Sequence, residues 1–231
     1  MFKKFDKIVL NVPHSSINDW DYGWDNPSQL FPHVKKWTDW FTDILFKPNE
    51  DLPVDMVVFP YSRFYVDAER LMDDPLEEKG QGRIYTNFEG CTRTIDDAST
   101  IISLKASWNN HQDNLSECIV SDDTLIIDCH SFPNDVCPDV EVNIGFNDDW
   151  SKPSNELIEF VKQAFEGAGL TVGVNKPYSN SITPDSIYCY RSLMIEINKR
   201  IYMNENTLLP NSFSFKALRT FLNDIYKQLL K

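Results

Sequence analysis

The chain has 231 residues and a formal net charge of -13 at pH 7, with 42% hydrophobic and 25% charged residues. This length suits one domain with a sizeable core, so we expect residues 1–231 to form a single domain. The negative charge argues against nucleic acid as a partner, because phosphate binding needs clustered lysine and arginine. A small anionic substrate is compatible with it, since a few arginines can make one pocket locally positive.

The hydrophobic runs are short, and none approaches the roughly 18 apolar residues of a membrane span, which argues against a membrane partner. The first apolar run, IVLNVP, lacks the length and the small-residue cleavage site of a signal peptide, so we expect a cytoplasmic location. Five cysteines without a C-x-x-C pair suggest neither a disulfide framework nor a cysteine zinc site. The sequence makes no prediction of the oligomeric state.

Short apolar runs alternate with longer helical patterns along the chain. The runs that we interpret as strands are 7–12, 56–61, 124–129, 140–146, 170–175 and 193–198. The segments with apolar residues at helical spacing are 33–46, 99–120, 154–168 and 212–230. This alternation predicts an α/β fold in which a mixed, largely parallel sheet lies between helices. Ligands in such folds bind beyond the carboxyl ends of the strands.

Two of the four histidines follow predicted strands in the same way. His14 comes after KIVLNVP, and His130 comes after TLIIDC, and a serine follows each histidine. If the two strands are parallel neighbours, both imidazoles reach one crevice. A metal site and two separate structural histidines are the two interpretations of this pattern. Asp128, two residues before His130, is a candidate to orient that imidazole if the fold brings the two together, and a more distant carboxylate would serve equally well.

A catalytic zinc normally takes three protein ligands and leaves one position for water. Asp39 and Asp43 are candidates for the third ligand, and their i, i+4 spacing would put both on one face of the predicted helix 33–46. Asp39 has tryptophan neighbours at 37 and 40, an unusually apolar setting for a carboxylate. A solvated helix face is the simpler interpretation, and we prefer it for Asp43.

Glu196 interrupts the apolar run LMIEIN, where a buried carboxylate needs a partner. An ion pair with Lys199 or Arg200 would satisfy it, and a role as general base near a metal-bound water is the alternative.

Three arginines are candidates for binding substrate carboxylates, because the guanidinium group can hold a carboxylate through two hydrogen bonds. Arg63 and Arg70 flank Asp67 in SRFYVDAERLMDD, and Arg83 lies in the loop GQGRIY. A simple pairing of Asp67 with Arg70 on a helical turn is the alternative interpretation.

In order along nearly the whole chain, several segments resemble the N-formylglutamate amidohydrolase family. They are NVPHSS, TDWFTDILF, SRFYVDAERL, GRIYTNF, IIDCHSFP, VNIGFND, NKPYSNSITP and IEINKRIYMNE. The resemblance implies a three-layer α/β/α sandwich similar to zinc-dependent exopeptidases. It also implies hydrolysis of N-formylglutamate, a small anionic substrate, to glutamate and formate.

The resemblance assigns roles to several positions of this sequence. His14 and His130 match the metal-binding histidines, and Asp39 matches the acidic position of the T-D-W motif. Glu196 and Asn198 match the closing E-x-N motif, which implies a general base and a substrate-binding amide. The implied cofactor is zinc, with another divalent metal such as iron or manganese as an alternative.

The chain departs from the family pattern at two glycine positions. Ser16 replaces the glycine of P-H-S-G, and Ser179–Ser181 replace a Gly-Gly pair. Losing glycine restricts how closely backbone approaches a ligand, so the acyl group and the amino acid of the substrate stay open. An N-acyl amino acid deacylase, a carboxypeptidase-like peptidase, a catalytically degenerate ligand-binding domain and an interaction protein with structural histidines are the alternatives.

Overall fold

The computed structural model describes residues 2–72 and 74–231, and its centre is a six-stranded sheet. The strand order is β2 (Val54–Val58), β1 (Lys7–Val12), β5 (Thr124–Phe132), β8 (Arg191–Asn198), β6 (Val142–Gly145) and β7 (Val172–Val174). The first four strands are parallel, β6 is antiparallel to β8, and β7 is parallel to β6. The predicted α/β fold with a mixed, largely parallel sheet is confirmed.

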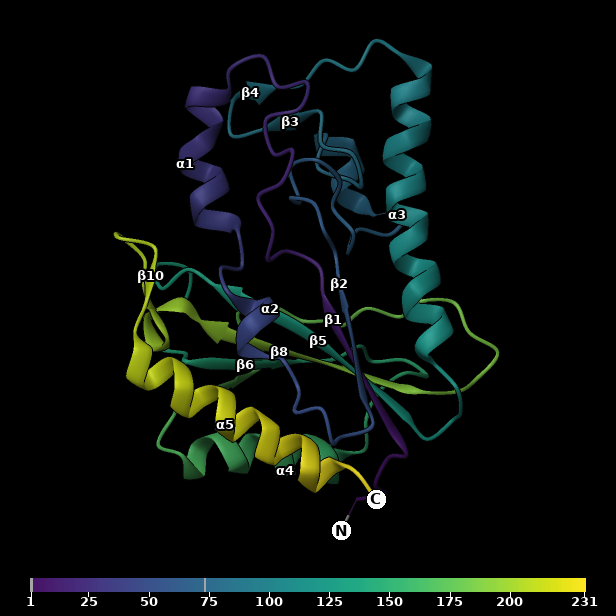
Figure 1. The fold of residues 1–231 in the computed structure, drawn as a ribbon, viewed down its shortest axis with the longest axis vertical. Coiled ribbons are helices and arrows are strands. Elements are labelled where there is room, and N and C mark those ends of the chain that lie inside the picture. Colours follow the sequence, from purple (N-terminus) through teal and green to yellow (C-terminus); the bar gives the residue numbers. More distant parts are fainter. Residues whose placement is uncertain (1, 73) are drawn as a thin grey trace.

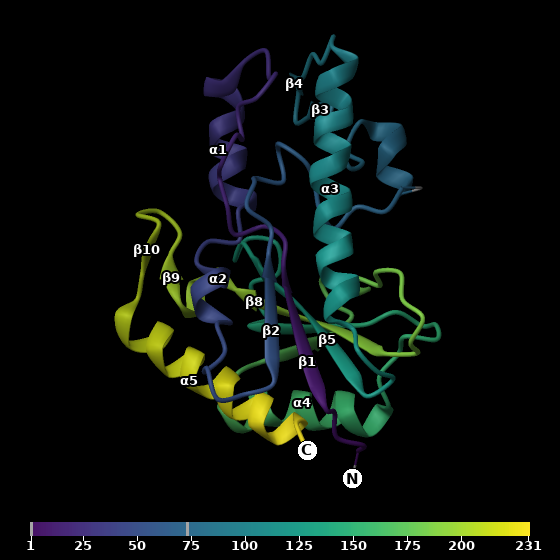
Figure 2. The same ribbon diagram turned by 45° about the vertical axis from the view of Figure 1, so that its right-hand side comes forward.

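Helices cover both faces of this sheet, as Figures 1 and 2 show. Helices α4 (Asn155–Gly167) and α5 (Ser212–Leu229) lie on one face, and α3 (Ala98–Cys118) contacts the other. Successive residues of a strand point to opposite faces. In β1, Ile8 and Leu10 therefore join the core beneath α4 and α5, while Val9 packs with Leu115 of α3. Among the described residues, no helix is both long and apolar enough to cross a membrane.

A smaller assembly lies beyond the ends of β1 and β2, on the side away from α4 and α5 (Figure 1). It contains α1 (Pro27–Trp37), the 3-10 helix η1 (Pro75–Lys79) and the short hairpin of β3 (Asn87–Phe88) and β4 (Cys91–Thr92). Its own apolar core contains Trp24, Leu30, Val34, Phe64, Tyr85, Phe88 and Cys91. This assembly provides one wall of the cavity described below.

The remaining elements are short and lie between the main ones. They are α2 (Thr42–Leu45), the 3-10 helix η2 (Lys199–Ile201), β9 (Met203–Asn204) and β10 (Leu209–Pro210).

The predicted helix 33–46 is wrong, because the chain breaks between α1 and α2. Thr38 is extended at φ -76° and ψ 132°, and Phe41 takes the left-handed conformation at φ 65°. The break places Asp39 outside any helix, where its backbone N–H donates to the carbonyl of His14 at 2.9 Å. The apolar spacing over 33–46 arises from two helices that bury side chains in different cores.

Candidate active site

The sheet brings His14, His130 and Glu196 to one edge. His14 follows β1, His130 lies near the end of β5, and Glu196 pairs with His130 across the parallel β5–β8 ladder. The two imidazole rings are 5.2 Å apart between centroids. From the sequence we expected both imidazoles in one crevice if their strands were parallel neighbours. Strands β1 and β5 are parallel neighbours, and so are β5 and β8.

Each imidazole contacts a buried aspartate through one nitrogen. His14 Nε2 lies 2.8 Å from Asp67 Oδ1, and His130 Nδ1 lies 3.0 Å from Asp39 Oδ2. Burial alone would raise the pKa of Asp67, but Arg63 and His14 hold it well below its usual range. An ionised carboxylate only accepts hydrogen bonds, so the Nε2–H of His14 donates to Asp67. The other nitrogen of His14, Nδ1, is then left with a free lone pair.

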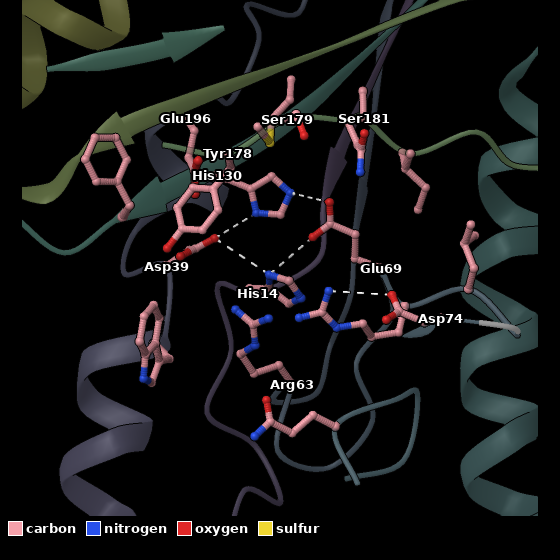
Figure 3. Close-up of a pocket in the computed structure, with 18 of the residues that line it drawn as sticks. His14, Asp39, Arg63, Glu69, Asp74, His130, Tyr178, Ser179, Ser181 and Glu196 are labelled. Carbon is pink, nitrogen blue, oxygen red and sulfur yellow. Dashed lines mark hydrogen bonds and ion pairs between the residues drawn. The ribbon is translucent and has the colours of Figure 1, made fainter. Parts of the chain in front are cut away.

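Glu69 faces the remaining nitrogens of both rings, as Figure 3 shows. Its carboxylate lies 3.8 Å from His14 Nδ1 and 3.2 Å from His130 Nε2. Both nitrogens are buried, and neither has a hydrogen-bond partner among the described residues. His14, Glu69 and His130 form a group whose ligand atoms lie within 4.8 Å of one another. Two imidazoles and a carboxylate are a donor set that divalent metals such as zinc accept, so these residues fit a metal ion.

Asp39 lies on the other side of the same two rings. Its Oδ2 atom is 3.8 Å from His14 Nδ1, in addition to the contact with His130. Two carboxylates, Asp39 and Glu69, therefore flank the pair of imidazoles. In the structure, Asp39 accepts a hydrogen bond from His130, and Glu69 is the carboxylate grouped with the two histidines as ligand atoms. A carboxylate that supports a ligating histidine in this way fixes the tautomer and the orientation of the ring.

Glu196 is 7% exposed and borders the same space. Burial raises the pKa of Glu196 to about 8. The Nδ2 group of Asn143 lies 3.5 Å from its Oε2 atom. No ion pair joins Glu196 to Lys199 or Arg200 among the described residues: Lys199 donates to the carbonyl of Lys36, and Arg200 pairs with Glu141. The simpler interpretation of Glu196 as half of a structural ion pair is wrong.

Asp128 is fully buried in β5 and lies on the same face as His130. Its Oδ1 atom is 3.1 Å from His130 Nε2 and accepts a hydrogen bond from Asn11 Nδ2 at 2.7 Å. Its Oδ2 atom accepts from the backbone N–H of Ile182 at 3.0 Å, which fixes a loop that lines the cavity. The hydrogen bond that orients the His130 ring comes from Asp39, the more distant carboxylate that the sequence left open.

Two of the three predicted arginines line the cavity. Arg63 Nη2 donates to Asp67 Oδ2 at 2.9 Å, and Arg70 Nε lies 3.6 Å from the same oxygen. Asp67 thus joins His14 to both guanidinium groups. The pairing of Asp67 with Arg70 that the sequence allowed is present, although the segment forms turns rather than a helix.

The structure places the other two predicted substrate-binding residues elsewhere. Arg83 is not a lining residue, because its guanidinium lies over the Trp108 ring, 4.8 Å from the centroid. Asn198 is buried and donates to Asn134 Oδ1 and to the carbonyl of Val140. Both assignments are corrected: a cation–π contact engages the first side chain, and loop hydrogen bonds engage the second.

The cavity around these groups has a volume of about 580 Å³, within the range of small-molecule sites. Its walls come from the sheet edge, from the smaller assembly and from the loop 178–183. Sequence reasoning missed Glu69, although it lies in the same DAER segment as Asp67 and Arg70. Tyr178 and Asn143 were also missed, because nothing in their local sequence separates them from ordinary loop and strand residues.

The structure accounts for both departures from the glycine pattern. Ser16 Oγ donates to the carbonyl of Pro60 at 2.8 Å and accepts from the N–H of Asn18, so it fixes the loop after His14. Asn180 takes φ 80°, the left-handed region that glycine favours and that asparagine tolerates better than most residues. The backbone conformation at this position survives without glycine.

The fold and the site define an α/β domain with a candidate metal centre, formed by two histidines and flanking carboxylates, at the carboxyl ends of its strands. A family model described as N-formylglutamate amidohydrolase matches residues 6–203 of the chain. The chain belongs to the N-formylglutamate amidohydrolase family.

Two solved structures share this fold. The N-formylglutamate amidohydrolase from Ralstonia eutropha JMP134 has a TM-score of 0.77 and 19% identity, covering 98% of this chain and 95% of that one. The gene product Atu2144 from Agrobacterium tumefaciens has a TM-score of 0.67 and 18% identity, covering 99% of this chain and 90% of that one. No curated protein matches the sequence.

Proposed function

We propose that the chain is a metal-dependent amidohydrolase that cleaves the amide bond of an N-formyl or N-acyl amino acid. The observation that carries the proposal is the pair of buried imidazole nitrogens, His14 Nδ1 and His130 Nε2. Among the described residues neither nitrogen makes a hydrogen bond of good geometry, and both face the carboxylate of Glu69. Glu196 lies beside them in the same cavity. The family supports an amidohydrolase acting on a small amino-acid-derived substrate.

We propose zinc as the metal, held by His14 and His130. Asp39, which the sequence predicted, or Glu69, which completes the group of ligand atoms, supplies the third ligand. A bound divalent metal lowers the pKa of water towards 7 and polarises a carbonyl. Asp67 and whichever carboxylate does not ligate would orient the histidines.

Glu196 is the proposed general base. Burial raises the pKa of Glu196 to about 8, but a divalent metal bound beside it would favour the ionised form. The carboxylate would then accept a proton from the attacking water and pass it to the amide nitrogen, and the C–N bond would break. Proton transfer of this kind contributes about 10²–10⁴-fold in rate. Asp128 would act as a positioning residue, because it holds Asn11 and the backbone of Ile182 while its Oδ1 atom lies 3.1 Å from His130 Nε2.

Arg63 and Arg70 would bind the carboxylate of the substrate. Both line the cavity, with side-chain exposures of 18% and 27%, and both form ion pairs with Asp67. N-formylglutamate is the first substrate to test, because the Ralstonia protein of the same fold is named N-formylglutamate amidohydrolase. The cytoplasmic location and the single-domain organisation stay predictions of the sequence.

The test compares turnover of N-formylglutamate, N-acetylglutamate and a dipeptide ending in glutamate, with and without a chelator. We expect release of formate from the first substrate, loss of activity after chelation and recovery with added zinc. Cleavage of N-acetylglutamate alone would make the enzyme an N-acyl amino acid deacylase, and cleavage of the dipeptide alone would identify a peptidase instead. Binding of N-formylglutamate without turnover of any substrate would identify a degenerate binding domain and contradict the proposal.

A further inference from the structure

Tyr178 presents a phenol to the cavity. Its side chain lines the cavity, and its hydroxyl makes no hydrogen bond to any described residue. Figure 3 shows the Tyr178 ring beside His130 and Glu196, with its hydroxyl near Asp39. A donor at this place lies next to the candidate metal ligands and Glu196, the residues that would act on the amide.

One buried amide joins the loop of Tyr178 to Glu196. Asn143, on β6, is fully buried and lies directly opposite Glu196 in the β6–β8 ladder. Its Nδ2 group donates to the carbonyl of Tyr178 at 2.9 Å and lies 3.5 Å from Glu196 Oε2. Its Oδ1 atom accepts from the N–H of Lys176 at 2.9 Å. These contacts leave the amide one orientation, and that orientation fixes the loop relative to the carboxylate.

We propose that Tyr178 is a further catalytic residue that donates a hydrogen bond to the carbonyl oxygen of the scissile amide, and that Asn143 positions it together with Glu196. This inference rests on the proposed function. When water adds to the carbonyl carbon, negative charge develops on the oxygen, and it disappears when the C–N bond breaks. The hydroxyl stabilises this charge and keeps its own proton, while Glu196 moves the proton from water to nitrogen.

The chemistry of the surroundings supports this role. Burial and the nearby charge of Glu196 raise the pKa of Tyr178 to about 12, so the hydroxyl stays protonated at neutral pH. A neutral donor placed where charge develops stabilises the transition state more than the substrate, so its removal lowers kcat rather than weakening substrate binding. A phenol that bound the substrate carboxylate would instead affect KM.

The first experiment compares Tyr178→Phe with wild type in the holoenzyme. We expect kcat to fall about 10²-fold and KM to change less than about threefold. The control is Tyr188→Phe, at a partly buried tyrosine outside the cavity, which should match wild type in both constants. An unchanged kcat in Tyr178→Phe, or a change confined to KM, would overturn the inference. An inactive wild type would instead contradict the proposed function.

The second experiment tests the positioning role. Asn143→Asp keeps the acceptor for Lys176 and loses both donors, so we expect kcat to fall while metal content stays at the wild-type value. Tyr178→Phe added to Asn143→Asp should lower kcat further by much less than tenfold, because the hydroxyl is already misplaced. Asn223→Asp is the matched control, since Asn223 is a buried amide that holds Asn49 and Lys47 far from the cavity. Full additivity, or an equal loss of kcat in the control, would contradict the positioning role.

Discussion

Nε2 of His14 lies 2.8 Å from Oδ1 of Asp67, and the other oxygen of this buried carboxylate accepts a hydrogen bond from Arg63. One side chain therefore joins the candidate metal centre to the guanidinium groups of the cavity. Asp67 fixes the tautomer of His14 and neutralises the arginine at the same time. A change at this position should disturb metal binding and substrate binding together.

Asp67→Asn should lower the affinity for zinc about 10–100-fold, because a neutral amide no longer fixes the proton on His14 Nε2. KM should also rise, since Arg63 loses its fixed partner. Competition with a chromophoric chelator measures the first effect. Asp43→Asn is the control, because Asp43 lies on α2 outside the cavity. Equal zinc affinity in Asp67→Asn and wild type would show that Asp67 does not orient the metal ligand.

Two single variants, Asp39→Asn and Glu69→Gln, identify the third metal ligand when they are compared. Loss of the ligating carboxylate should abolish stoichiometric metal binding. Loss of the other should weaken binding about 10–100-fold and still allow saturation at high zinc. Metal titration of both variants gives the answer. If both variants bind zinc as tightly as wild type, the metal does not lie between these residues.

His111 should make the stability of the fold depend on pH. It is buried in α3, its Nε2 lies 2.8 Å from Asn11 Oδ1, and burial lowers the pKa of His111 to about 4. The unfolded chain, with an ordinary histidine pKa near 6.5, binds more protons between these values, so the free energy of unfolding falls as pH drops. Between pH 7.5 and pH 5 the loss should be about 2 kcal/mol.

Urea unfolding of wild type and His111→Gln at the two pH values measures this contribution. The variant should lose less stability than wild type on acidification, because glutamine does not titrate. The difference between the two proteins in the free energy of unfolding cancels the contribution of carboxylates that titrate in both. An identical pH dependence would mean that His111 is protonated equally in the folded and unfolded states.

Asn180 should tolerate glycine better than alanine. Its φ of 80° costs an ordinary side chain about 1 kcal/mol, and glycine adopts this conformation without that cost. We expect Asn180→Gly to be at least as stable as wild type and Asn180→Ala to be about 1 kcal/mol less stable than Asn180→Gly. Thermal unfolding of the three proteins measures the difference. Equal stability of the alanine and glycine variants would contradict a strained backbone at this position.

Most of the sheet was predictable from the sequence, because its strands are apolar on both faces. The segment 7–12 coincides with β1, and 124–129 and 193–198 fall within β5 and β8. Polar residues at the ends of these strands indicated where the cavity lies. The strand order and the antiparallel β6 depend on contacts between distant segments, which no local pattern contains.

The failures of the sequence interpretation have physical reasons. The apolar spacing of 33–46 resembled one helix, but Phe41 takes a left-handed conformation and Asp39 turns towards His14. No local pattern singled out Glu69, because only the folded loop brings it against both imidazoles. Arg83 looked suited to a ligand until the tertiary structure placed it over Trp108.

Metal content is the most direct test of the proposed site. Wild type, His14→Ala, His130→Ala and His33→Ala would be loaded with zinc, desalted and analysed, with circular dichroism to check folding. His33 is the control, because it lies on α1 and packs against Phe88 rather than facing the other histidines. We predict about one tightly bound zinc ion per chain in wild type and His33→Ala, and loss of that ion in the other two. Full metal retention by folded His14→Ala and His130→Ala would contradict the proposed metal centre.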